Sequence, residues 1–404
     1  MRRLAVLSMH TSPLAQPGSG DGGGMNVYVR QLSAALARNG VQVDVYTRAD
    51  DPSVPAVVGV EPGLRVHHIA AGPLAPMPKR ELEGVVEEFT EGVAARFRDH
   101  PPDALHANYW LSGVAGHVLK HRFELPLGCT FHTLSRVKGL DASDPRDRTR
   151  SEASVIGCSD AVVTSSAAEA DEIVELYGAD PARVAVIAPG VDHALFGPGA
   201  RAAARRAVGL RSRGPVLLWV GRVQPLKGLD VAVESLARLG GSGDDAVLVV
   251  VGGASGPEGG PYLDRVRRGA RDLGVAERIE WVPPQPHGAL SSYYRAADVV
   301  LVPSRSESFG LVALEAAACG TPVVVSPVGG LRTLVVDGST GFVRPRTADA
   351  FAEAATRLIG DPGRADEMGR QAAARASRFT WSGAALRLEA LFDELADRAP
   401  VLCV

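Results

Sequence analysis

Two glutamates in the segment Pro303–Glu315, PSRSESFGLVALE, could serve one ligand from two sides. Glu307 and Glu315 stand eight positions apart, and the apolar run Val299–Val302 precedes the segment. This pattern predicts a strand, a tight turn and a helix, and ligands bind at such turns in α/β sheets. We expect Glu307 at the turn and Glu315 about two helical turns further on, so that each carboxylate meets one end of a ligand.

The backbone between the two glutamates adds an anion site. Ser308, Phe309 and Gly310 fall at the predicted helix start, where NH groups have no partner inside the helix and face an anion. An amphipathic helix with a solvated glutamate at each end would give the same local sequence. The rest of the chain therefore has to decide between the two interpretations.

Two cations stand in a second strand-to-helix loop. Arg222 and Lys227 follow the apolar run Val216–Val220, and Lys227 is one of only four lysines, which makes a lysine inside a motif noticeable. Two cations at such a loop suit a diphosphate. Because parallel strands end at one edge of a sheet, we expect both cations to converge with the turn after Glu307 on one anionic group. Glu315 is then placed for ribose hydroxyls and Glu307 for a sugar beyond the diphosphate. Solvated basic residues on a surface loop are the alternative.

A glycine-rich loop follows the first predicted strand, Leu4–Ser8, and leads into a helix predicted over Met25–Arg38. It carries five glycines between positions 18 and 24, and glycine lets the backbone approach a substrate closely. Gly24 and Asn26 sit at the positive end of the helix. The spacing is not a dinucleotide fingerprint, since the acidic residue Asp44 falls inside a strand. We predict a ligand-binding loop, with a plain surface loop as the alternative.

The composition describes a globular protein of two domains. At 404 residues the chain exceeds one ordinary core, and 46% apolar with 22% charged residues is typical of soluble domains. A net charge of −3 argues against a nucleic-acid or acidic membrane surface. No apolar run approaches the roughly 18 residues of a membrane span, and the N-terminal run ends at His10, short of a signal peptide. We expect a cytoplasmic protein without an integral membrane segment.

The four cysteines, Cys129, Cys158, Cys319 and Cys403, show no closely spaced pair. Three of them lie in apolar or small-residue segments. We expect buried free thiols in a reducing cytoplasm rather than disulfides or a zinc site.

Strand and helix patterns alternate along the chain, which predicts parallel sheets with helices on both faces. A Pro- and Gly-rich linker over Val184–Gly199 separates two such series. We therefore expect an α/β protein with two doubly wound Rossmann-like domains facing a cleft. Residues 1–195 form the first domain, 196–380 the second, and 381–404 a C-terminal helix that packs across the hinge. Helices of the first series are expected over Glu81–Phe97 and Gly113–Lys120.

The second half resembles the donor half of family 4 retaining glycosyltransferases, which have the GT-B fold. The resemblance rests on Arg222 with Lys227, on ESFGLVALE, and on the later segments EAAACGTPVVVSPVGG and DGSTGFV. It implies that the two cations hold the diphosphate of a nucleotide sugar, that Glu315 holds the ribose, and that the region of Glu307 holds the transferred sugar. No Asp-x-Asp occurs in the sequence, which fits transfer without a metal ion at the leaving group. The implied donor residues are Gly24, Arg222, Lys227, Glu307, Ser308, Phe309, Gly310, Leu311 and Glu315.

The first half resembles the inositol-phosphate N-acetylglucosaminyltransferases of mycothiol synthesis, and sucrose-phosphate synthases share part of the pattern. The resemblance rests on DGGGMNVYV, KREL, NYWLSG, FHTLSRVK and PRDR. It implies a set of acceptor residues, with Asn26 at a hydroxyl and the other four at a phosphate: Asn26, Lys79, Tyr109, Thr133 and Arg148. Two cations and two hydroxyls make a good monophosphate site. Tyr109 as a core residue and Arg148 as part of a surface basic cluster are the alternatives.

His132 follows the apolar run Leu127–Phe131, and the resemblance implies that it contacts the donor sugar. A satisfied core histidine is the alternative. The implied catalytic residues are Arg222, Lys227, Glu307 and His132. The chain departs from the pattern at HANYW, where a second histidine is usual, and at Glu152-Ala153-Ser154, where Glu-Gln-Gln is usual. These differences bear on the identity of the acceptor.

The resemblance implies transfer of N-acetylglucosamine or glucose from a UDP-sugar to an inositol-phosphate-like acceptor, with no cofactor and no essential metal. No side chain in these motifs looks like an activated covalent nucleophile, and same-face attack explains retention in the family. The alternatives are a sugar phosphate or an aminocyclitol as acceptor, a non-catalytic two-domain binding protein, and a sugar-nucleotide epimerase. A homodimer is left open.

Overall fold

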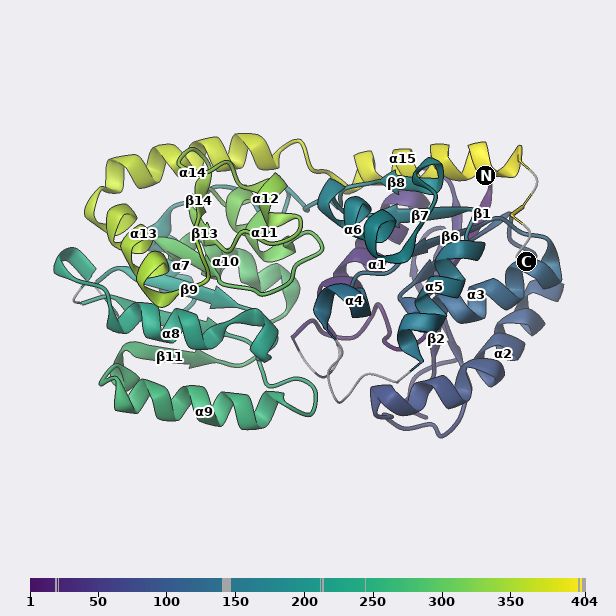
Figure 1. Ribbon diagram of the computed structural model, residues 1–404, viewed down its shortest axis with the longest axis horizontal. Helices are drawn as coiled ribbons and strands as arrows, with labels where there is room; N and C mark the ends of the chain where they lie inside the picture. The colour runs from purple at the N-terminus through teal and green to yellow at the C-terminus, as the bar shows by residue number, and fades with distance from the viewer. Residues whose placement is uncertain are drawn as a thin grey trace. The chain divides into compact units, whose positions relative to one another are not determined.

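Two mainly parallel sheets organise the chain (Figure 1). The computed structural model describes residues 1–18, 20, 22–139, 147–210, 212, 214–243, 245–398 and 400–401. The contacts divide these residues into two units, each with its own sheet. Unit 1 comprises Met1–Ala15, Met25–Gly190 and the described residues from Trp381 on, and unit 2 comprises Gln16–Gly24 and Val191–Thr380.

The sheet of unit 1 has the order β3-β4-β2-β1-β5-β6-β7-β8, and all neighbours are parallel except the pair β3 and β4. Its central strands β1, β5, β6 and β7 are buried at every residue except Arg3, as expected for parallel strands that helices cover on both faces. The strands are β1 (Arg3–Leu7), β2 (Gln42–Arg48), β3 (Val57–Glu61), β4 (Leu64–Ile69), β5 (Ala104–Asn108), β6 (Leu127–Thr130), β7 (Ala161–Thr164) and β8 (Val184–Val186).

Apolar side chains such as Phe89, Trp110 and Phe131 fill the core of unit 1. The C-terminal helix, yellow in Figure 1, belongs to this unit, and a Cβ built on Gly128 of β6 would lie 2.8 Å from the ring of its Phe392. The helices are α1 (Gly24–Arg38), η1 (Lys79–Val85), α2 (Val86–Asp99), α3 (Trp110–Phe123), α4 (Ser135–Lys138), α5 (Arg148–Cys158), α6 (Ala167–Tyr177), η2 (Pro181–Arg183) and α15 (Trp381–Ala396).

The sheet of unit 2 is parallel throughout and has the order β11-β10-β9-β12-β13-β14. The first strand thus lies at the centre, and the order runs outward in both directions from the boundary between β9 and β12. This boundary is the topological switch point of a doubly wound sheet. The strands are β9 (Val216–Val220), β10 (Val247–Val251), β11 (Ile279–Val282), β12 (Val299–Val302), β13 (Val323–Val325) and β14 (Gly341–Val343).

Among the helices of unit 2, α8 contacts α9 and α13, α10 contacts α7 and α11, and α14 contacts both α11 and α13. Crossover helices are expected on both faces of a parallel sheet. The helices are α7 (Arg201–Ala207), η3 (Pro225–Lys227), α8 (Leu229–Ala237), η4 (Gly241–Gly243), α9 (Gly259–Asp272), η5 (Ala276–Arg278), η6 (His287–Ala289), α10 (Leu290–Ala296), α11 (Leu311–Ala318), α12 (Leu331–Leu334), α13 (Ala348–Gly360) and α14 (Pro362–Ala376).

The two doubly wound sheets confirm the predicted fold class, while several elements differ from the prediction. The helix expected over Glu81–Phe97 begins instead with the 3-10 turn η1, and the one expected over Gly113–Lys120 spans Trp110–Phe123. The antiparallel β3 and the helix α14 were not predicted. Neither element belongs to the alternating strands and helices on which the prediction of the fold was based.

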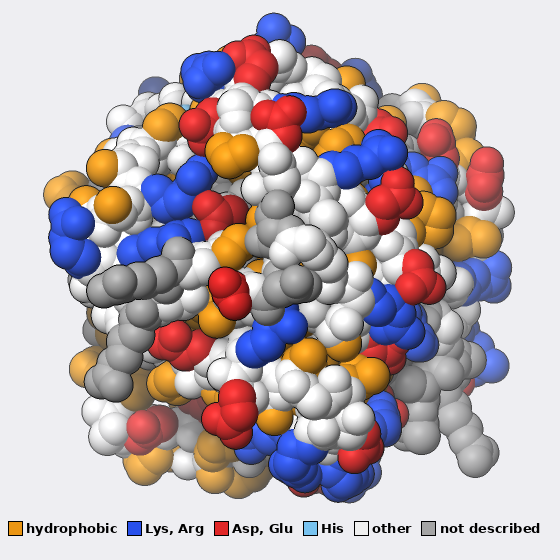
Figure 2. All heavy atoms as spheres, turned by 90° about the vertical axis from the view of Figure 1, so that its left-hand side faces the viewer, with side chains coloured by type: hydrophobic (Ala, Val, Ile, Leu, Met, Phe, Trp, Pro, Cys, Tyr) orange, Lys and Arg blue, Asp and Glu red, His pale blue; other side chains and the backbone are white. Residues whose placement is uncertain are grey.

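Charges of both signs are mixed on the molecular face shown in Figure 2, without a broad region of one sign. Many surface charges are paired along single helices, as in Arg357 with Glu353 and Arg370 with Glu367. Among the described residues, no helix combines the length and apolar character that crossing a membrane requires.

The cysteines divide into two kinds. Cys129 and Cys319 are buried free thiols, as predicted, and burial raises the pKa of each to about 12. Cys158 is disulfide-bonded, so the prediction was wrong for this residue. Spacing along the chain could not reveal it, because a disulfide joins residues that are close in the fold. Cys403 lies outside the described residues.

Candidate functional site

The predicted donor residues Lys227 and Glu307 lie at the switch point of the unit 2 sheet. Lys227 ends η3 in the loop after β9, and Glu307 lies in the loop after β12. Since β9 and β12 are neighbours in the sheet, their following loops meet at the same edge. The two loops that the sequence predicts at one sheet edge therefore meet there, while their binding of a common anion stays a prediction.

The loops after β9 and β12 are joined by their backbones. The NH of Arg305 donates to the carbonyl of Leu226 at 2.8 Å. Gly228, with φ of 70°, makes the approach possible, because a Cβ at this position would lie 2.1 Å from the carbonyl oxygen of Pro303. Nζ of Lys227 lies 2.6 Å from Oε1 of Glu307. The two side chains are only 28% and 15% exposed, so the pair is partly shielded from water but reachable.

The glycine loop, Gln16–Gly24, lies against the same edge of unit 2. The guanidinium of Arg222 lies beside Gly23, where a Cβ would come within 2.9 Å of its Nε. At Gly24, a Cβ would lie 3.5 Å from the side chain of Leu311. The close backbone approach that the glycines predict is thus used to seat the loop beside predicted donor residues. Residues 19 and 21 of this loop lie outside the described residues.

The helix α11 begins at Leu311 with Gly310 as its N-cap, and Gly310 has φ of 98°. Ser308 and Phe309 therefore belong to the loop, and Phe309 is buried against the ring of Phe379 at 5.6 Å between centroids. The NH groups of the first helical turn point out of this end of the helix. The carbonyl of Glu307 accepts a hydrogen bond from the NH of Gly330 at 3.2 Å, which fixes the loop from the other side.

Glu315 lies closer to the helix start than predicted. The prediction of about two helical turns between the glutamates is wrong because Glu307 precedes the helix, so only Leu311–Glu315, roughly one turn, is helical. Glu315 is 5% exposed. Its Oε1 lies 2.6 Å from Nε2 of His287, and its Oε2 accepts a hydrogen bond from the hydroxyl of Tyr294 at 2.7 Å.

His287 and Tyr294 are therefore neighbours of the site that sequence reasoning missed. Burial disfavours the charged form of His287, but the nearby carboxylate of Glu315 outweighs it, and the pKa of His287 is raised. Burial and the same carboxylate raise the pKa of Tyr294. Each oxygen of Glu315 thus has its own partner, His287 at Oε1 and the hydroxyl of Tyr294 at Oε2. Neither residue stands in a recognisable motif, and only their position before β12 could have suggested them.

The predicted acceptor residues gather at the switch point of unit 1. The order of its strands reverses between β1 and β5, and Tyr109 directly follows β5. Nζ of Lys79, at the start of η1, lies 4.3 Å from the centre of the Tyr109 ring. Cζ of Arg148, at the start of α5, lies 5.2 Å from it. The guanidinium of Arg148 also donates to the carbonyl and to Oγ1 of Thr133, at 3.0 and 3.2 Å. Four residues from four separate segments thus form one cluster around Tyr109, the Tyr109 cluster.

A buried carboxylate fixes Arg148. Nε of Arg148, which is 1% exposed, donates at 2.8 Å to Oε1 of Glu152 one turn along α5. Glu152 also accepts hydrogen bonds from Ser135, through both NH and Oγ, and from the hydroxyl of Tyr177. Burial, and then the bond to Glu152, raise the pKa of Tyr177 to about 12, so this hydroxyl stays a donor. Glu152 itself agrees with the Glu-Gln-Gln pattern of the family. The sequence departs from that pattern only at the next two residues, Ala153 and Ser154.

The backbone is strained at two of the predicted site residues. Tyr109 has φ of 75° and His132 has φ of 61°, in the left-handed region that residues other than glycine rarely adopt. Each follows a central strand of unit 1, β5 or β6. Strain of this kind persists only where the surroundings impose it, and it is concentrated at functional sites.

His132 is a neutral imidazole. Its Nε2 donates to Oδ1 of Asn108 at 2.9 Å, and its ring lies 4.8 Å from that of Tyr28. Desolvation lowers the pKa of His132 to about 3, and His106 acts in the same direction. At neutral pH His132 therefore offers hydrogen bonding without charge.

Asn26, predicted to meet an acceptor hydroxyl, lies buried in the first turn of α1. Its Nδ2 donates to Oγ1 of Thr11 at 2.7 Å and to the carbonyl of Ser12 at 2.6 Å. The amide is thus oriented by the start of the loop that follows β1.

Each switch point carries a group of residues whose chemistry could bind an anion. Unit 2 has Lys227, Arg222 and the start of α11, which suits a diphosphate. Unit 1 has the Tyr109 cluster, with two cations and two hydroxyls, which suits a single phosphate group. Among the described residues, the side chains of these two groups are ones that the sequence analysis predicts as site residues.

Two family models cover most of the chain. Residues 23–190 match the "Glycosyl transferase 4-like domain" model, and residues 200–375 match the "Glycosyl transferases group 1" model. The D-inositol 3-phosphate glycosyltransferase of Actinosynnema mirum is 46% identical, with 98% of each chain covered. The protein of the same name from Kribbella flavida is 45% identical, with 94% of this chain and 93% of that protein covered.

Solved structures give the same picture for the fold. The sucrose-phosphate synthase of Thermosynechococcus elongatus superposes with a TM-score of 0.90 at 33% identity, covering 98% of this chain and 99% of that one. Anabaena HepE in complex with UDP and glucose superposes with a TM-score of 0.78, covering 98% of this chain and 100% of that one. At 20% identity the second likeness shows the fold alone.

Proposed function

This chain belongs to the glycosyltransferase family of the D-inositol 3-phosphate glycosyltransferases, and on that premise we propose that it transfers a sugar from a UDP-sugar to an inositol phosphate with retention. The sugar is N-acetylglucosamine or glucose. The reaction uses no cofactor and no essential metal. A cytoplasmic location, where UDP-sugars are made, and a homodimer are part of the same proposal.

The Tyr109 cluster is the observation that carries the proposal. Lys79 and Arg148 approach one tyrosine ring, and Thr133 lies within hydrogen-bond distance of the guanidinium. Thr133 is exposed, so an acceptor can reach this cluster. A monoanionic or dianionic phosphate would receive charge-assisted hydrogen bonds from both cations. Glu152 balances the charge of Arg148, and Lys79 is then the cation that most strongly favours a phosphorylated acceptor over a neutral one.

The donor would lie at the switch point of unit 2. Lys227, Arg222 and the start of α11 would stabilise the diphosphate as negative charge develops on it. Glu315, held by His287 and Tyr294, would accept from the ribose hydroxyls. Oε1 of Glu307 accepts hydrogen bonds from Lys227 and from Oγ of Ser304, at 2.6 and 2.9 Å, and its Oε2 would accept a hydrogen bond from the transferred sugar.

The reaction would proceed by same-face attack. The bond between the anomeric carbon and the diphosphate oxygen breaks, the acceptor hydroxyl forms the new bond on the same face, and its proton passes to the departing phosphate oxygen. The protein would contribute positioning and stabilisation of the leaving group. His132, neutral and fixed by Asn108, fits a hydrogen bond to the sugar and not a role as proton donor.

A sugar phosphate is the second candidate acceptor. The structural likeness to a sucrose-phosphate synthase, at 33% identity over nearly the whole chain, is the observation that favours it. Both candidates share the phosphate group, so the Tyr109 cluster serves either one. An aminocyclitol without a phosphate would leave this cluster unused.

The test is a panel of purified reactions with mass spectrometry of the products. The full chain would be incubated with UDP-N-acetylglucosamine, UDP-glucose or GDP-mannose, and with D-inositol 3-phosphate, fructose 6-phosphate or unphosphorylated inositol. We expect the glycosylated inositol phosphate with a UDP-sugar, and retained configuration by NMR of the product. If fructose 6-phosphate is the only acceptor that gives a product, the acceptor is a sugar phosphate and not an inositol phosphate. If unphosphorylated inositol reacts as fast as D-inositol 3-phosphate, the proposed phosphate site is wrong.

A further inference from the structure

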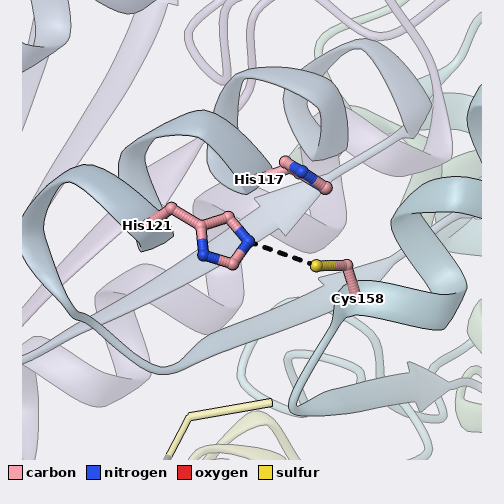
Figure 3. A group of neighbouring side chains, drawn as sticks. All are labelled: His117, His121 and Cys158. Atoms are coloured by element: carbon pink, nitrogen blue, oxygen red, sulfur yellow. Dashed lines mark hydrogen bonds between the residues drawn. The ribbon is translucent and has the colours of Figure 1, made fainter. Parts of the chain in front are cut away.

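Three side chains that could bind a metal ion lie together in unit 1, toward the C-terminal ends of α3 and α5. The N-terminal ends of the same two helices lie at Tyr109 and Arg148 of the Tyr109 cluster. His117 and His121 stand on the second half of α3, and Cys158 is the last residue of α5. Figure 3 shows the ring of His121 directed at the sulfur of Cys158, with His117 beside it. Among the described residues, no other three His, Cys, Asp or Glu side chains lie close enough together to hold a metal ion.

The spacing of the three residues suits a tetrahedral ion. Two histidines at positions i and i+4 of a helix share one face, the arrangement in which helical histidines chelate zinc. Their ring centres lie 5.1 Å apart, and Nε2 of His121 lies 3.3 Å from Sγ of Cys158. One ligand atom of each residue lies within 4.8 Å of the others. A tetrahedral zinc ion would need separations of roughly 3.5 Å, which small side-chain rotations supply.

The backbone around Cys158 is fixed from two sides. Nζ of the buried Lys120 donates to the carbonyl of Cys158 and to Oδ2 of Asp160, both at 2.8 Å. The guanidinium of Arg183 donates to the carbonyls of Gly157 and Ser159, at 3.0 and 3.1 Å. These hydrogen bonds hold the backbone that carries the sulfur next to α3, and hydrogen bonds around a metal site hold its ligands in the same way.

We propose that His117, His121 and Cys158 form a site for a divalent transition-metal ion of the zinc class in the thiol-reduced protein. Two imidazoles and one thiolate favour zinc, and a water molecule completes the tetrahedron. Binding removes the thiol proton to solvent and forms the sulfur–metal bond, without a change of oxidation state. The inference is independent of the proposed glycosyl transfer.

Oxidation state decides whether the site can form. Cys158 is disulfide-bonded in the structure, and a sulfur in a disulfide supplies no thiolate. A phosphine and one water molecule reduce the disulfide: the phosphorus takes the oxygen of the water and becomes the phosphine oxide, the sulfur–sulfur bond breaks, and each sulfur takes one of the two protons and becomes a thiol. Disulfide and metal are then alternative states of the same sulfur.

The site would fasten two helices that carry acceptor residues. α3 begins one residue after Tyr109, and α5 begins with Arg148. The helices already touch between the first turn of α3 and the last turn of α5, where a Cβ on Gly113 would lie 2.7 Å from the side chain of Val155. A metal ion near their C-terminal ends would add a second point of attachment, remote from the Tyr109 cluster.

The test is Co²⁺ binding to the full chain after reduction with a phosphine and removal of metals. We expect one Co²⁺ per chain, with the sulfur-to-cobalt charge-transfer band and the intense visible bands of a tetrahedral ion, displaced by Zn²⁺. His121→Ala, His117→Ala and Cys158→Ser should each weaken binding at least tenfold, and Cys158→Ser should also remove the charge-transfer band. His100→Ala, at an exposed histidine outside the group, is the matched control and should bind as the wild type does.

Two results would overturn the proposal. One is the absence of a charge-transfer band when Co²⁺ is added to the reduced wild-type protein. The other is unchanged Co²⁺ affinity in both histidine variants, which would place the ion elsewhere. Because His121 is exposed and His117 half-buried, both variants should fold, and circular dichroism would verify this before titration. The unreduced protein should show no band, as the disulfide predicts.

Discussion

Nζ of Lys227 lies 2.6 Å from Oε1 of Glu307, although 80 positions separate the two residues along the chain. The pair joins the loops that follow β9 and β12 at the switch point of the unit 2 sheet. Without a ligand, the cation and the carboxylate neutralise one another. A bound diphosphate would compete with Glu307 for Lys227, so the pair connects leaving-group binding with the position of the carboxylate.

Lys227→Ala should reduce kcat at least ~100-fold, because removal of one preorganised donor at a developing anion costs about 3 kcal/mol. Steady-state kinetics with the UDP-sugar would measure the loss, and calorimetric titration with UDP should show weaker binding. Arg238→Ala, at a partly exposed arginine directly after α8, is the control and should leave both quantities unchanged. A Lys227→Ala enzyme with full activity would rule out the diphosphate role.

Lys79→Ala should raise KM for a phosphorylated acceptor at least ~10-fold, since loss of a charge-assisted contact costs about 1.5 kcal/mol or more. KM for the UDP-sugar should stay the same, because Lys79 lies at the Tyr109 cluster of unit 1. The adjacent Arg80, an exposed residue 3.6 Å from Glu81, provides the matched variant Arg80→Ala with little expected effect. Equal changes in both KM values would show that Lys79 acts on something other than the acceptor phosphate.

Arg148→Ala should destabilise the protein by ~3–5 kcal/mol, because it leaves the buried carboxylate of Glu152 without its cation. Urea unfolding followed by circular dichroism would measure this. Arg148→Met combined with Glu152→Leu should recover part of the loss, since neither charge then remains buried. If the double variant is less stable than Arg148→Ala, the buried ion pair is not the source of the loss.

His106 should make the protein sensitive to acid. Burial lowers its pKa from 6.5 to about 4, so the folded state favours the neutral ring and the unfolded state takes up the proton first. Above pH 6.5 the ring is neutral in both states, and His106 does not lower the free energy of unfolding. As the pH falls from 6.5 toward 4, protonation of His106 in the unfolded state lowers the free energy of unfolding by about 1.4 kcal/mol per pH unit. Unfolding free energies between pH 7 and 4.5 should fall less steeply for His106→Gln than for the wild type. The exposed His100→Gln is the control, and equal slopes for all three proteins would refute the assignment.

Excess EDTA should leave the rate of sugar transfer unchanged, because Lys227, Arg222 and the start of α11 are proposed to stabilise the leaving diphosphate. Initial rates with and without chelator, and after addition of Mg²⁺, would test this. A loss of activity that Mg²⁺ restores would mean that a cation at the diphosphate is required. In the thiol-reduced protein, loss of Zn²⁺ from the proposed site of His117, His121 and Cys158 would change the stability and not the rate.

Much of the donor site could be predicted because its parts follow continuous apolar strands. The runs Val216–Val220 and Val299–Val302 mark where the β9 and β12 loops begin, and parallel strands bring these loops to one edge. The meeting of Lys227 and Glu307 then follows from strand order alone. Lys79 and Arg148 could not be joined in this way, and only the family resemblance placed them together.

The remaining parts of the site depend on contacts that have no local signal. His287 and Tyr294, which hold Glu315, come from segments 28 and 21 positions earlier in the chain. Glu152 stands one turn after Arg148, but its role depends on Ser135 and Tyr177 from other elements. Nothing in the residue types of Tyr109 and His132 indicates a positive φ, because packing imposes it.

The contact of Phe392 with Gly128 has a consequence for how the chain is made. Phe392 belongs to α15, which the ribosome adds only after all of Val191–Thr380 has been synthesised. At ~5–20 residues per second, roughly 10–40 s separate the emergence of the two parts of unit 1. During this interval the β6 surface at Gly128 lacks its covering helix. The part of unit 1 that is made before Val191 is therefore incomplete until α15 has been made, and the nascent chain carries an exposed apolar surface until then.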